Sequence, residues 1–251
     1  MRRLSATARI LFVLLATCAF QSVNAEVRER IGYAYDKQTG NLIYSESHRE
    51  VIENGRLVGD TVIYRDADGN VFAEKYIDFR KNQVMPDFHL VNADNGHVEG
   101  ARARDEQFKI HFRALSDSGI REASVMAPSN GIVDAGFDRF IEQHWDALVG
   151  GKTLEREFLI PSQLEFYTFE IEKIQEQPAG DYVFKLHIKS RFLRLFVSPV
   201  FVHYDAQTRQ LLRYEGISNI RNEDGENFEV RIEFPTANRM RVGARGGAPV
   251  T

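Results

Sequence analysis

The stretch "YSESHREVI" carries residues whose types and spacing could bind a metal ion. Glu46, His48 and Glu50 recur at every second position, so in a strand their side chains lie on one side. Carboxylate and neutral imidazole groups together can hold a divalent transition metal. The same alternation is typical of an exposed strand whose polar face meets water. We favour this solvated outer face, because no HExxH or other histidine-rich spacing accompanies it, and we predict no metal.

Two further motifs invite a chemical interpretation. "RDADGNV" begins like a calcium loop, with Asp66, Asp68 and Asn70, but it lacks the later bidentate glutamate, so a hairpin turn is favoured. His144 precedes Trp145, the only tryptophan, and could act as a general base if a carboxylate oriented it. A core histidine is the favoured interpretation.

Other catalytic signatures are missing from the sequence. It contains no GxSxG elbow and no Walker loop, and its single cysteine, Cys18, precedes the expected mature chain. We therefore predict a protein that is not an enzyme and needs no cofactor.

Residues 1–25 are expected to be a signal peptide. A basic start, "MRRLSATAR", is followed by the apolar run "ILFVLLATCAF" and by small residues before Glu26, where cleavage is predicted. The protein should then be periplasmic or secreted. Lipidation at Cys18 is the less favoured alternative, because Thr17 precedes it where a smaller residue is usual. No later apolar run is long enough for a transmembrane helix, so none is expected after cleavage.

The charge balance bears on the class of partner. The chain has 36 acidic and 32 basic residues, a formal net charge of −4. Nucleic-acid binding needs clustered positive charge, so we expect no nucleic-acid partner.

Period-two alternation dominates the rest of the chain and predicts strands with one buried face. It is clearest in "EQFKIHFRA", "DYVFKLHIKS" and "ENFEVRIEF". Turn signals such as "DKQTGN", "DADGN" and "NEDGEN" separate these runs. Together they predict one antiparallel β domain of about twelve strands over 26–240, followed by a flexible tail over 241–251.

One segment has helical spacing instead. Apolar residues recur three and four positions apart in "DAGFDRFIEQHWDALVGG", which predicts an amphipathic helix near 135–149. Asp134 is the expected N-cap and Gly150 the stop. The apolar stripe of a lone helix must be buried, so we expect the helix on the concave face of a curved sheet or half-barrel.

The stretch "RFLRLFVSPVFVHYD" is unusually apolar. Leu193, Leu195 and Val197 would form one face of a strand over 191–197, and Pro199 would end it. In "EFLIPSQLEFYTFEIEK", Tyr167 and Phe169 share a face in the same way. We expect the 191–197 strand to face the helix, around either a filled core or a ligand cavity.

The stretches 136–174, "GFDRFIEQHWDALVGGKTLEREFLIPSQLEFYTFEIEKI", and 202–220, "VHYDAQTRQLLRYEGISNI", resemble an uncharacterised family of secreted bacterial β-rich proteins. The fold of that family is similar to the half-barrel of the periplasmic lipoprotein carriers. The resemblance implies an open sheet wrapped round helical structure, with an acyl chain bound inside.

Two functions are therefore weighed for an envelope protein. The first is a non-catalytic binding or carrier protein for an apolar or lipid-like ligand. The second is a structural or interaction protein with a filled core, whose edge strand pairs with an envelope protein partner. In the first case the ligand-lining residues would be Phe137, Ile141, His144, Trp145, Leu148, Tyr167, Phe169, Leu193, Leu195 and Val197.

Overall fold

A single antiparallel sheet organises the protein in its computed structural model. The structure describes residues 25–174, 180–195 and 197–235. The predicted leader, except Ala25, and the predicted tail lie outside these residues.

The sheet has fifteen strands, not the twelve expected, in the order β8-β7-β6-β5-β4-β3-β2-β1-β15-β14-β13-β12-β11-β10-β9. The first and last of the described strands are therefore neighbours at its centre, and within the described residues only the β9–β10 pairing is parallel. The strands are β1 (Ala25–Asp36), β2 (Leu42–Glu53), β3 (Arg56–Asp66), β4 (Val71–Asp78), β5 (Asp87–Asn92), β6 (Val98–Arg104), β7 (Gln107–Arg113), β8 (Arg121–Met126), β9 (Gly131–Ile132), β10 (Leu154–Ile160), β11 (Glu165–Lys173), β12 (Asp181–Ile188), β13 (Val200–Asp205), β14 (Leu211–Arg221) and β15 (Asn227–Glu233). The mainly β fold with a large curved sheet is thus confirmed.

Five of the turns between strands form in the same way. Asp36, Asp66, Asn92, Asp205 and Asn222 each end a strand or directly follow one, and a side-chain oxygen of each accepts hydrogen bonds from backbone N–H groups two to four positions later. Such Asx turns reverse the chain without unpaired backbone groups. The carboxylate of Asp66 is used in this way, which confirms the hairpin interpretation of "RDADGNV".

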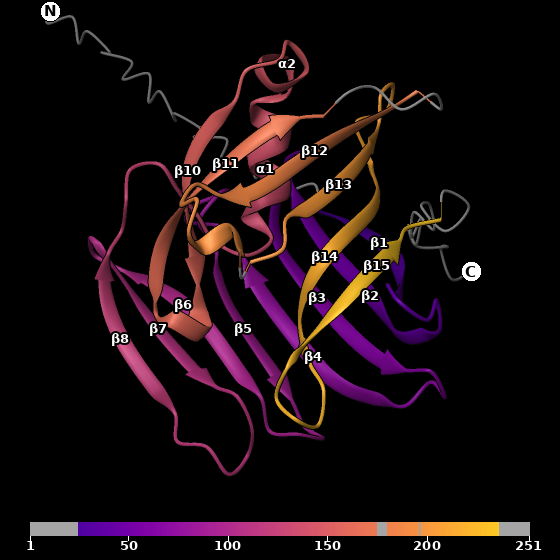
Figure 1. The fold of residues 1–251 in the computed structure, drawn as a ribbon, viewed down its shortest axis with the longest axis vertical. Helices are drawn as coiled ribbons and strands as arrows, with labels where there is room; N and C mark the ends of the chain where they lie inside the picture. Colours follow the sequence, from indigo (N-terminus) through magenta and orange to yellow (C-terminus); the bar gives the residue numbers. More distant parts are fainter. Residues whose placement is uncertain (1–24, 175–179, 196, 236–251) are drawn as a thin grey trace, which may run out of the picture.

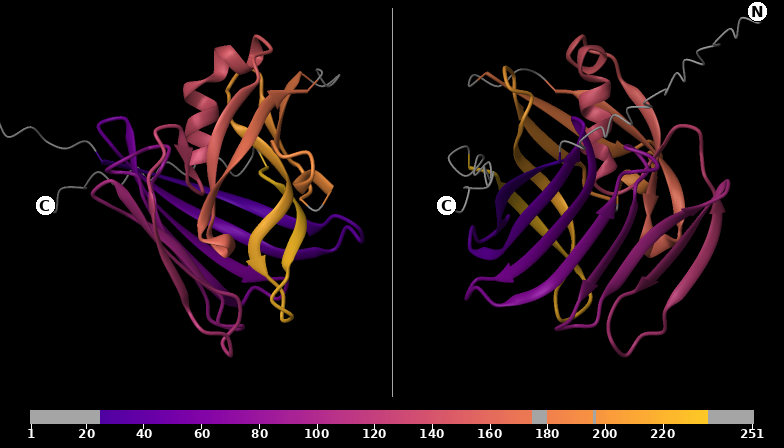
Figure 2. Two further views of the ribbon diagram at one scale, coloured as in Figure 1. Left: turned by 60° about the vertical axis from the view of Figure 1, so that its left-hand side comes forward. Right: turned by 180° about the vertical axis from the view of Figure 1, so that it is seen from behind.

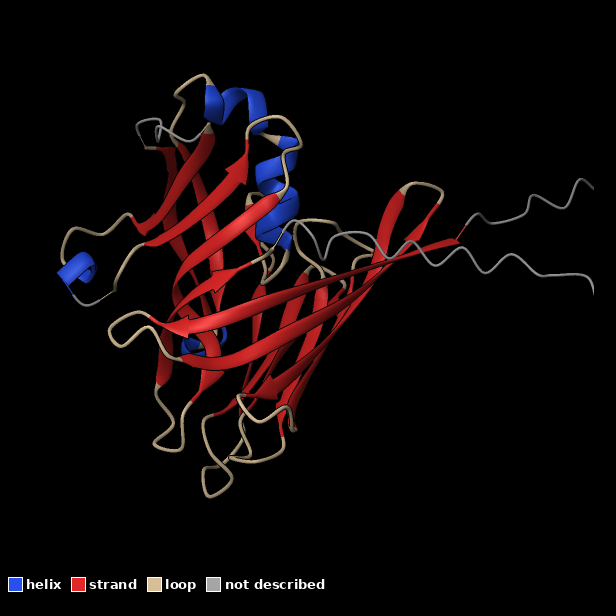
Figure 3. Cartoon of the chain, turned by 90° about the vertical axis from the view of Figure 1, so that its right-hand side faces the viewer, coloured by secondary structure: helices blue, strands red, loops and turns tan. Residues whose placement is uncertain are grey.

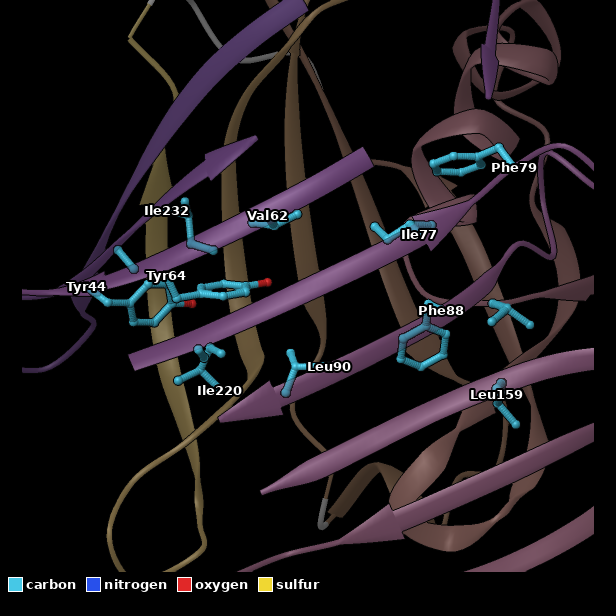
Figure 4. Packing of buried hydrophobic residues seen from close by; sticks show 14 of the residues in the cluster. Tyr44, Val62, Tyr64, Ile77, Phe79, Phe88, Leu90, Leu159, Ile220 and Ile232 are labelled. Atoms are coloured by element: carbon cyan, nitrogen blue, oxygen red, sulfur yellow. The ribbon is translucent and has the colours of Figure 1, made fainter. Parts of the chain in front are cut away.

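The sheet curls until its two halves face one another (Figure 1 and Figure 2). Side chains from both halves fill the space between them. Figure 4 shows Tyr44, Tyr64 and Leu90 of the β1–β8 half in the same packed layer as Ile220 and Ile232 of the other half. The phenol of Tyr44 reaches Ser218 Oγ across this layer at 2.7 Å.

The predicted helix exists as two short pieces, α1 (Gly136–Gln143) and α2 (Trp145–Val149), at one end of the space between the halves (Figure 3). Its start is held tightly, because a Cβ atom at Gly136 would lie 2.0 Å from the carbonyl oxygen of Val84. Asp134 is not the N-cap: that position is Ala135, without a side-chain cap. Asp134 instead has φ 44° and its carboxylate pairs with Lys75.

The expected strand over 191–197 is wrong. Leu193–Leu195 form a 3₁₀ turn, η2, and Leu195 is 76% exposed. The physical reason is the position of β12, which pairs with β11 on one side and with β13 on the other. Both edges of β12 are occupied, so the segment that follows it can only connect strands. A second 3₁₀ turn, η1 (Pro161–Gln163), joins β10 to β11.

Candidate functional site

A network of charged side chains lies buried between strands β1–β4 and helix α1. Glu46, His48 and Glu50 share one face of β2, as predicted, but that face is the interior one, and each residue is less than 10% exposed. The expected solvated outer face is therefore wrong. The same interior row begins with Tyr44 and ends with Ile52, which are buried apolar neighbours and fix its orientation.

His48 is held between two carboxylates. Its Nδ1 lies 2.8 Å from Asp60 Oδ2 on β3, and its Nε2 lies 3.2 Å from Glu46 Oε1. Burial and the nearby guanidinium of Arg30 oppose protonation, but the two carboxylates outweigh them and raise the pKa of His48. Burial also disfavours the charged carboxylates, yet His48 and Arg30 lower the pKa values of Glu46 and Asp60. The imidazole of His48 is thus held between two carboxylates, which favour its protonated form.

Arg30 on β1 extends the network towards the end of β15. Its Nε donates to Glu50 Oε1 at 3.2 Å, and its guanidinium carbon lies 4.9 Å from the centre of the Phe234 ring. Burial lowers the pKa of Arg30, but Glu50 and the surrounding carboxylates have the larger opposite effect, so the pKa is raised overall. A half-buried guanidinium is well matched by this combination of a carboxylate and an aromatic face.

Two contacts join the network to the helix. Lys75 on β4 lies 3.1 Å from Asp134 Oδ2, directly before α1. In the first turn of α1, Asp138 accepts a hydrogen bond from the Tyr204 hydroxyl and pairs with Arg139. Burial raises the pKa of Asp138, but Arg139, Arg30 and Tyr204 together lower it. Charged groups therefore fix the helix to both halves of the sheet.

The network does not have the geometry of a catalytic base. Both ring nitrogens of His48 are engaged by carboxylates, so neither is left to accept a proton from a substrate. Within the described ranges, no three His, Cys, Asp or Glu side chains lie close enough together to hold a metal ion. The arrangement stabilises the joint between helix and sheet.

A polar cavity of about 360 Å³ opens beside the network and shares Glu50 and Arg139 with it. Arginine and glutamate side chains alternate round its wall, including Arg28, Arg56 and Glu142. This surface suits a polar group and not an acyl chain, because burying its charges against methylene groups would be costly.

The residues predicted to line an apolar ligand are mostly brought together, as a packed core. Phe137, Ile141, Trp145, Leu148 and Phe169 are all buried in one cluster with strands β11–β13. Trp145 makes edge-to-face contacts with Tyr182, Phe184 and Tyr204.

The other predicted lining residues are more peripheral. Tyr167, Leu193 and Val197 are half-buried against this cluster, whereas Leu195 points away from it into solvent. His144 donates from Nδ1 to the Phe140 carbonyl oxygen and accepts at Nε2 from Arg156, so both of its nitrogens serve the fold.

Sequence reasoning missed Arg30, Asp60, Lys75 and Asp138. A signal for Lys75 was present, because it alternates with Ala73 and Ile77, the two apolar residues of β4 that point inward. The same parity argument applies to Glu46, His48 and Glu50, which lie between Tyr44 and Ile52. Alternate residues of a strand point to the same face, so their position along the strand, and not their polarity, places these groups inside.

The two edges of the sheet differ. β8 pairs with β7 alone, in the register Phe108↔Val125 and Ile110↔Ala123. Its ends are marked by Ile120 and Met126, which are 54% and 59% exposed. The opposite edge, β9, has two residues, both buried, and leads into the helix. A short buried edge cannot receive another strand, but a six-residue exposed edge can.

These features define a mainly β protein with an open, curled sheet, apolar clusters packed between its two halves and a six-residue exposed strand at one edge. No helix in the described part of the chain is long and apolar enough to cross a membrane.

No known protein family matches the sequence, and no curated protein does. Among solved structures, the chain is similar to a beta-barrel-like protein of a domain of unknown function, DUF1849, from Brucella abortus. The two share 10% identity with a TM-score of 0.48, over 85% of this chain and 98% of the other. A similarity of this size assigns no activity.

Proposed function

We propose that this chain is a non-catalytic interaction protein of the bacterial envelope, secreted through its N-terminal leader, which receives an extended segment of a partner protein on strand β8. The observation that carries this proposal is that β8 has a strand neighbour on one side only, with exposed apolar residues at both ends. A free edge presents backbone donors and acceptors, to which an added strand binds.

The rest of the molecule supports the role of a rigid scaffold. The helix stripe is packed into a filled core, and charged pairs fix the helix to both halves of the sheet. β8 lacks proline and lysine, the residues that commonly protect an edge, and its charged pair Arg121–Glu122 stands only at its start. The partner segment is expected to alternate, with apolar side chains near Ile120 and Met126.

A photo-reactive residue placed at Ser124 in the producing cell tests the proposal, with Gln207 in an exposed turn of the other half as control. We expect a discrete adduct with one partner from Ser124 only. In the purified complex, hydrogen exchange of the β8 amides should slow. Replacing Ile120 and Met126 by lysine should abolish the adduct, whereas Val91→Lys on the outer face should not.

Three results would overturn this proposal: equal adducts from both positions, unchanged exchange of the β8 amides in the complex, or an adduct between two copies of this chain. The last would show that the edge pairs with itself.

Carriage of an apolar ligand is the second candidate. The observation in its favour is the η2 segment, whose Leu193 and Val197 cover the helix cluster only partly. Displacing that segment would uncover part of this cluster. A fatty acid titrated into delipidated protein should then shift the Trp145 emission, and an unchanged spectrum over the soluble range would remove this candidate.

A further inference from the structure

Two histidines meet on the outer face of the sheet, far from the buried network. His89 on β5 and His111 on β7 are separated by β6, yet the Nδ1 atom of His89 lies 2.9 Å from the Nε2 atom of His111. The ring centres are 5.0 Å apart. In the described structure this is a direct contact between two imidazoles, both on the convex side.

The strand between them makes this contact possible. His89 is opposite Gly100 in β6, and Gly100 is opposite His111. A Cβ atom at Gly100 would lie 2.5 Å from His111 Cε1 and 2.8 Å from its Nε2. Any side chain at position 100 would therefore push the rings apart.

A carboxylate continues the same row. Glu122 on β8 is the register partner of His111, and its side chain is exposed on the outer face. Four neighbouring strands thus present histidine, glycine, histidine and glutamate in line. In the described conformation Glu122 does not complete a three-ligand group with the histidines. Cross-strand neighbours are within reach of long side chains, so a rotamer change can bring its carboxylate to the histidine pair.

The spacing of the nitrogens fits a shared metal ion. Two imidazole nitrogens bound at about 2.05 Å are about 2.9 Å apart at a right angle, and about 3.3 Å apart at the tetrahedral angle. The observed 2.9 Å is the length of a hydrogen bond between the two imidazoles, and it is also the separation that two nitrogens would have at a right angle on a tetragonal ion, the geometry that Cu²⁺ and Ni²⁺ prefer with nitrogen and oxygen ligands.

From this geometry we infer that His89 and His111 form a surface site for one divalent transition ion, with Cu²⁺ preferred, and that Glu122 supplies a third ligand. The site leaves further coordination positions open to water. The two histidines belong to interior strands of the sheet, so the histidine pair does not depend on the proposed partner of β8, whereas Glu122 lies on β8 itself.

Titration of the untagged protein with Cu²⁺, followed by calorimetry and electron paramagnetic resonance, tests the site. We expect one ion per chain and a spectrum showing coupling to two nitrogens. His89→Gln and His111→Gln should each weaken binding at least about tenfold, and Glu122→Gln by a few-fold. His203→Gln, which removes a histidine of the other half of the sheet, should leave affinity unchanged.

Gly100→Ala provides a sharper test, since it keeps both imidazoles but separates them. It should weaken binding as strongly as loss of one histidine, with circular dichroism confirming that the variant is folded. Unchanged affinity in the His89→Gln/His111→Gln double variant, or a spectrum without nitrogen coupling, would overturn the site. Because the histidine variants change only outward-facing side chains, they remain informative if Gly100→Ala fails to fold.

Discussion

The Nδ1 atom of His48 lies 2.8 Å from the Oδ2 atom of Asp60, a diagonal neighbour across strands β2 and β3. Both side chains are less than 10% exposed. Paired charges at such depth lose the free energy of hydration. Their mutual attraction offsets this loss only if the geometry is good. His48 has this support on both sides, because Glu46 engages its second nitrogen.

The first prediction concerns pH. The pKa of His48 is raised in the folded state, so its stabilisation is complete below its unfolded value, near 6.5, and is lost as pH rises through the folded value. The pKa values of Glu46 and Asp60 are lowered, so their stabilisation is present above about pH 4 and is lost as pH falls further. The contribution of this triad should therefore be largest between about pH 4.5 and 6.5.

Urea unfolding of the wild type and of His48→Gln across pH 3–9 measures this contribution as the difference in unfolding free energy. The difference should fall at both ends of the range. His203→Gln, which removes a histidine whose side chain is 16% exposed and pairs with Glu215, is the control. A difference that is constant across this range would show that His48 is neutral in the fold.

The second prediction concerns the Lys75–Asp134 pair, whose side chains are 10% and 12% exposed. Lys75→Met should reduce the unfolding free energy by about 3–5 kcal/mol, because it leaves a buried carboxylate without its ammonium partner. Adding Asp134→Asn should restore part of the loss, since asparagine tolerates the positive φ at this position. Losses that simply add in the double variant would contradict this coupling.

The third prediction compares two leucines. Leu148 in α2 is fully buried, whereas Leu195 is 76% exposed. Leu148→Ala should cost about 2–5 kcal/mol of unfolding free energy. Leu195→Ala should change it by less than about 0.5 kcal/mol, as is usual for surface substitutions. Thermal or urea unfolding distinguishes these values easily, and a large loss at Leu195 would mean that the segment packs inward in solution.

The fourth prediction concerns the start of α1. Gly136→Ala would place a methyl group 2.0 Å from the Val84 carbonyl oxygen, so the helix or the segment before β5 must move. We expect a loss of about 1–3 kcal/mol in unfolding free energy. Gly119→Ala is the matched control, because nothing lies within 4 Å of its added methyl group. Equal stabilities of the two variants would show that this contact is not tight.

Much of the fold could be predicted from local rules. Alternation in "EQFKIHFRA" and the Asx turns at Asp36 and Asp66 depend only on neighbours in sequence, and they give strands and hairpins directly. The helix near 135–149 follows in the same way from the spacing of Phe137, Ile141 and Leu148.

The failures come from long-range context. Leu193, Leu195 and Val197 satisfy the pattern of a strand, but both edges of the preceding strand β12 are already paired, with β11 and β13. Glu46, His48 and Glu50 look solvated because their compensating partners, Arg30, Asp60 and Lys75, come from three other strands. Likewise, only the strand order reveals that His89 and His111 meet across Gly100.

The pairing of β1 with β15 has a consequence for folding in the cell. Tyr33 is opposite Glu233, so the central seam joins residues about as far apart in sequence as the described chain allows. Neighbouring hairpins on either side close short loops and can form early, but this seam requires a very long one. On the ribosome β1 emerges first, and one of its edges has no partner until β15 is made. We therefore expect slow final folding, during which a chaperone that covers the exposed edge of β1 would suppress aggregation.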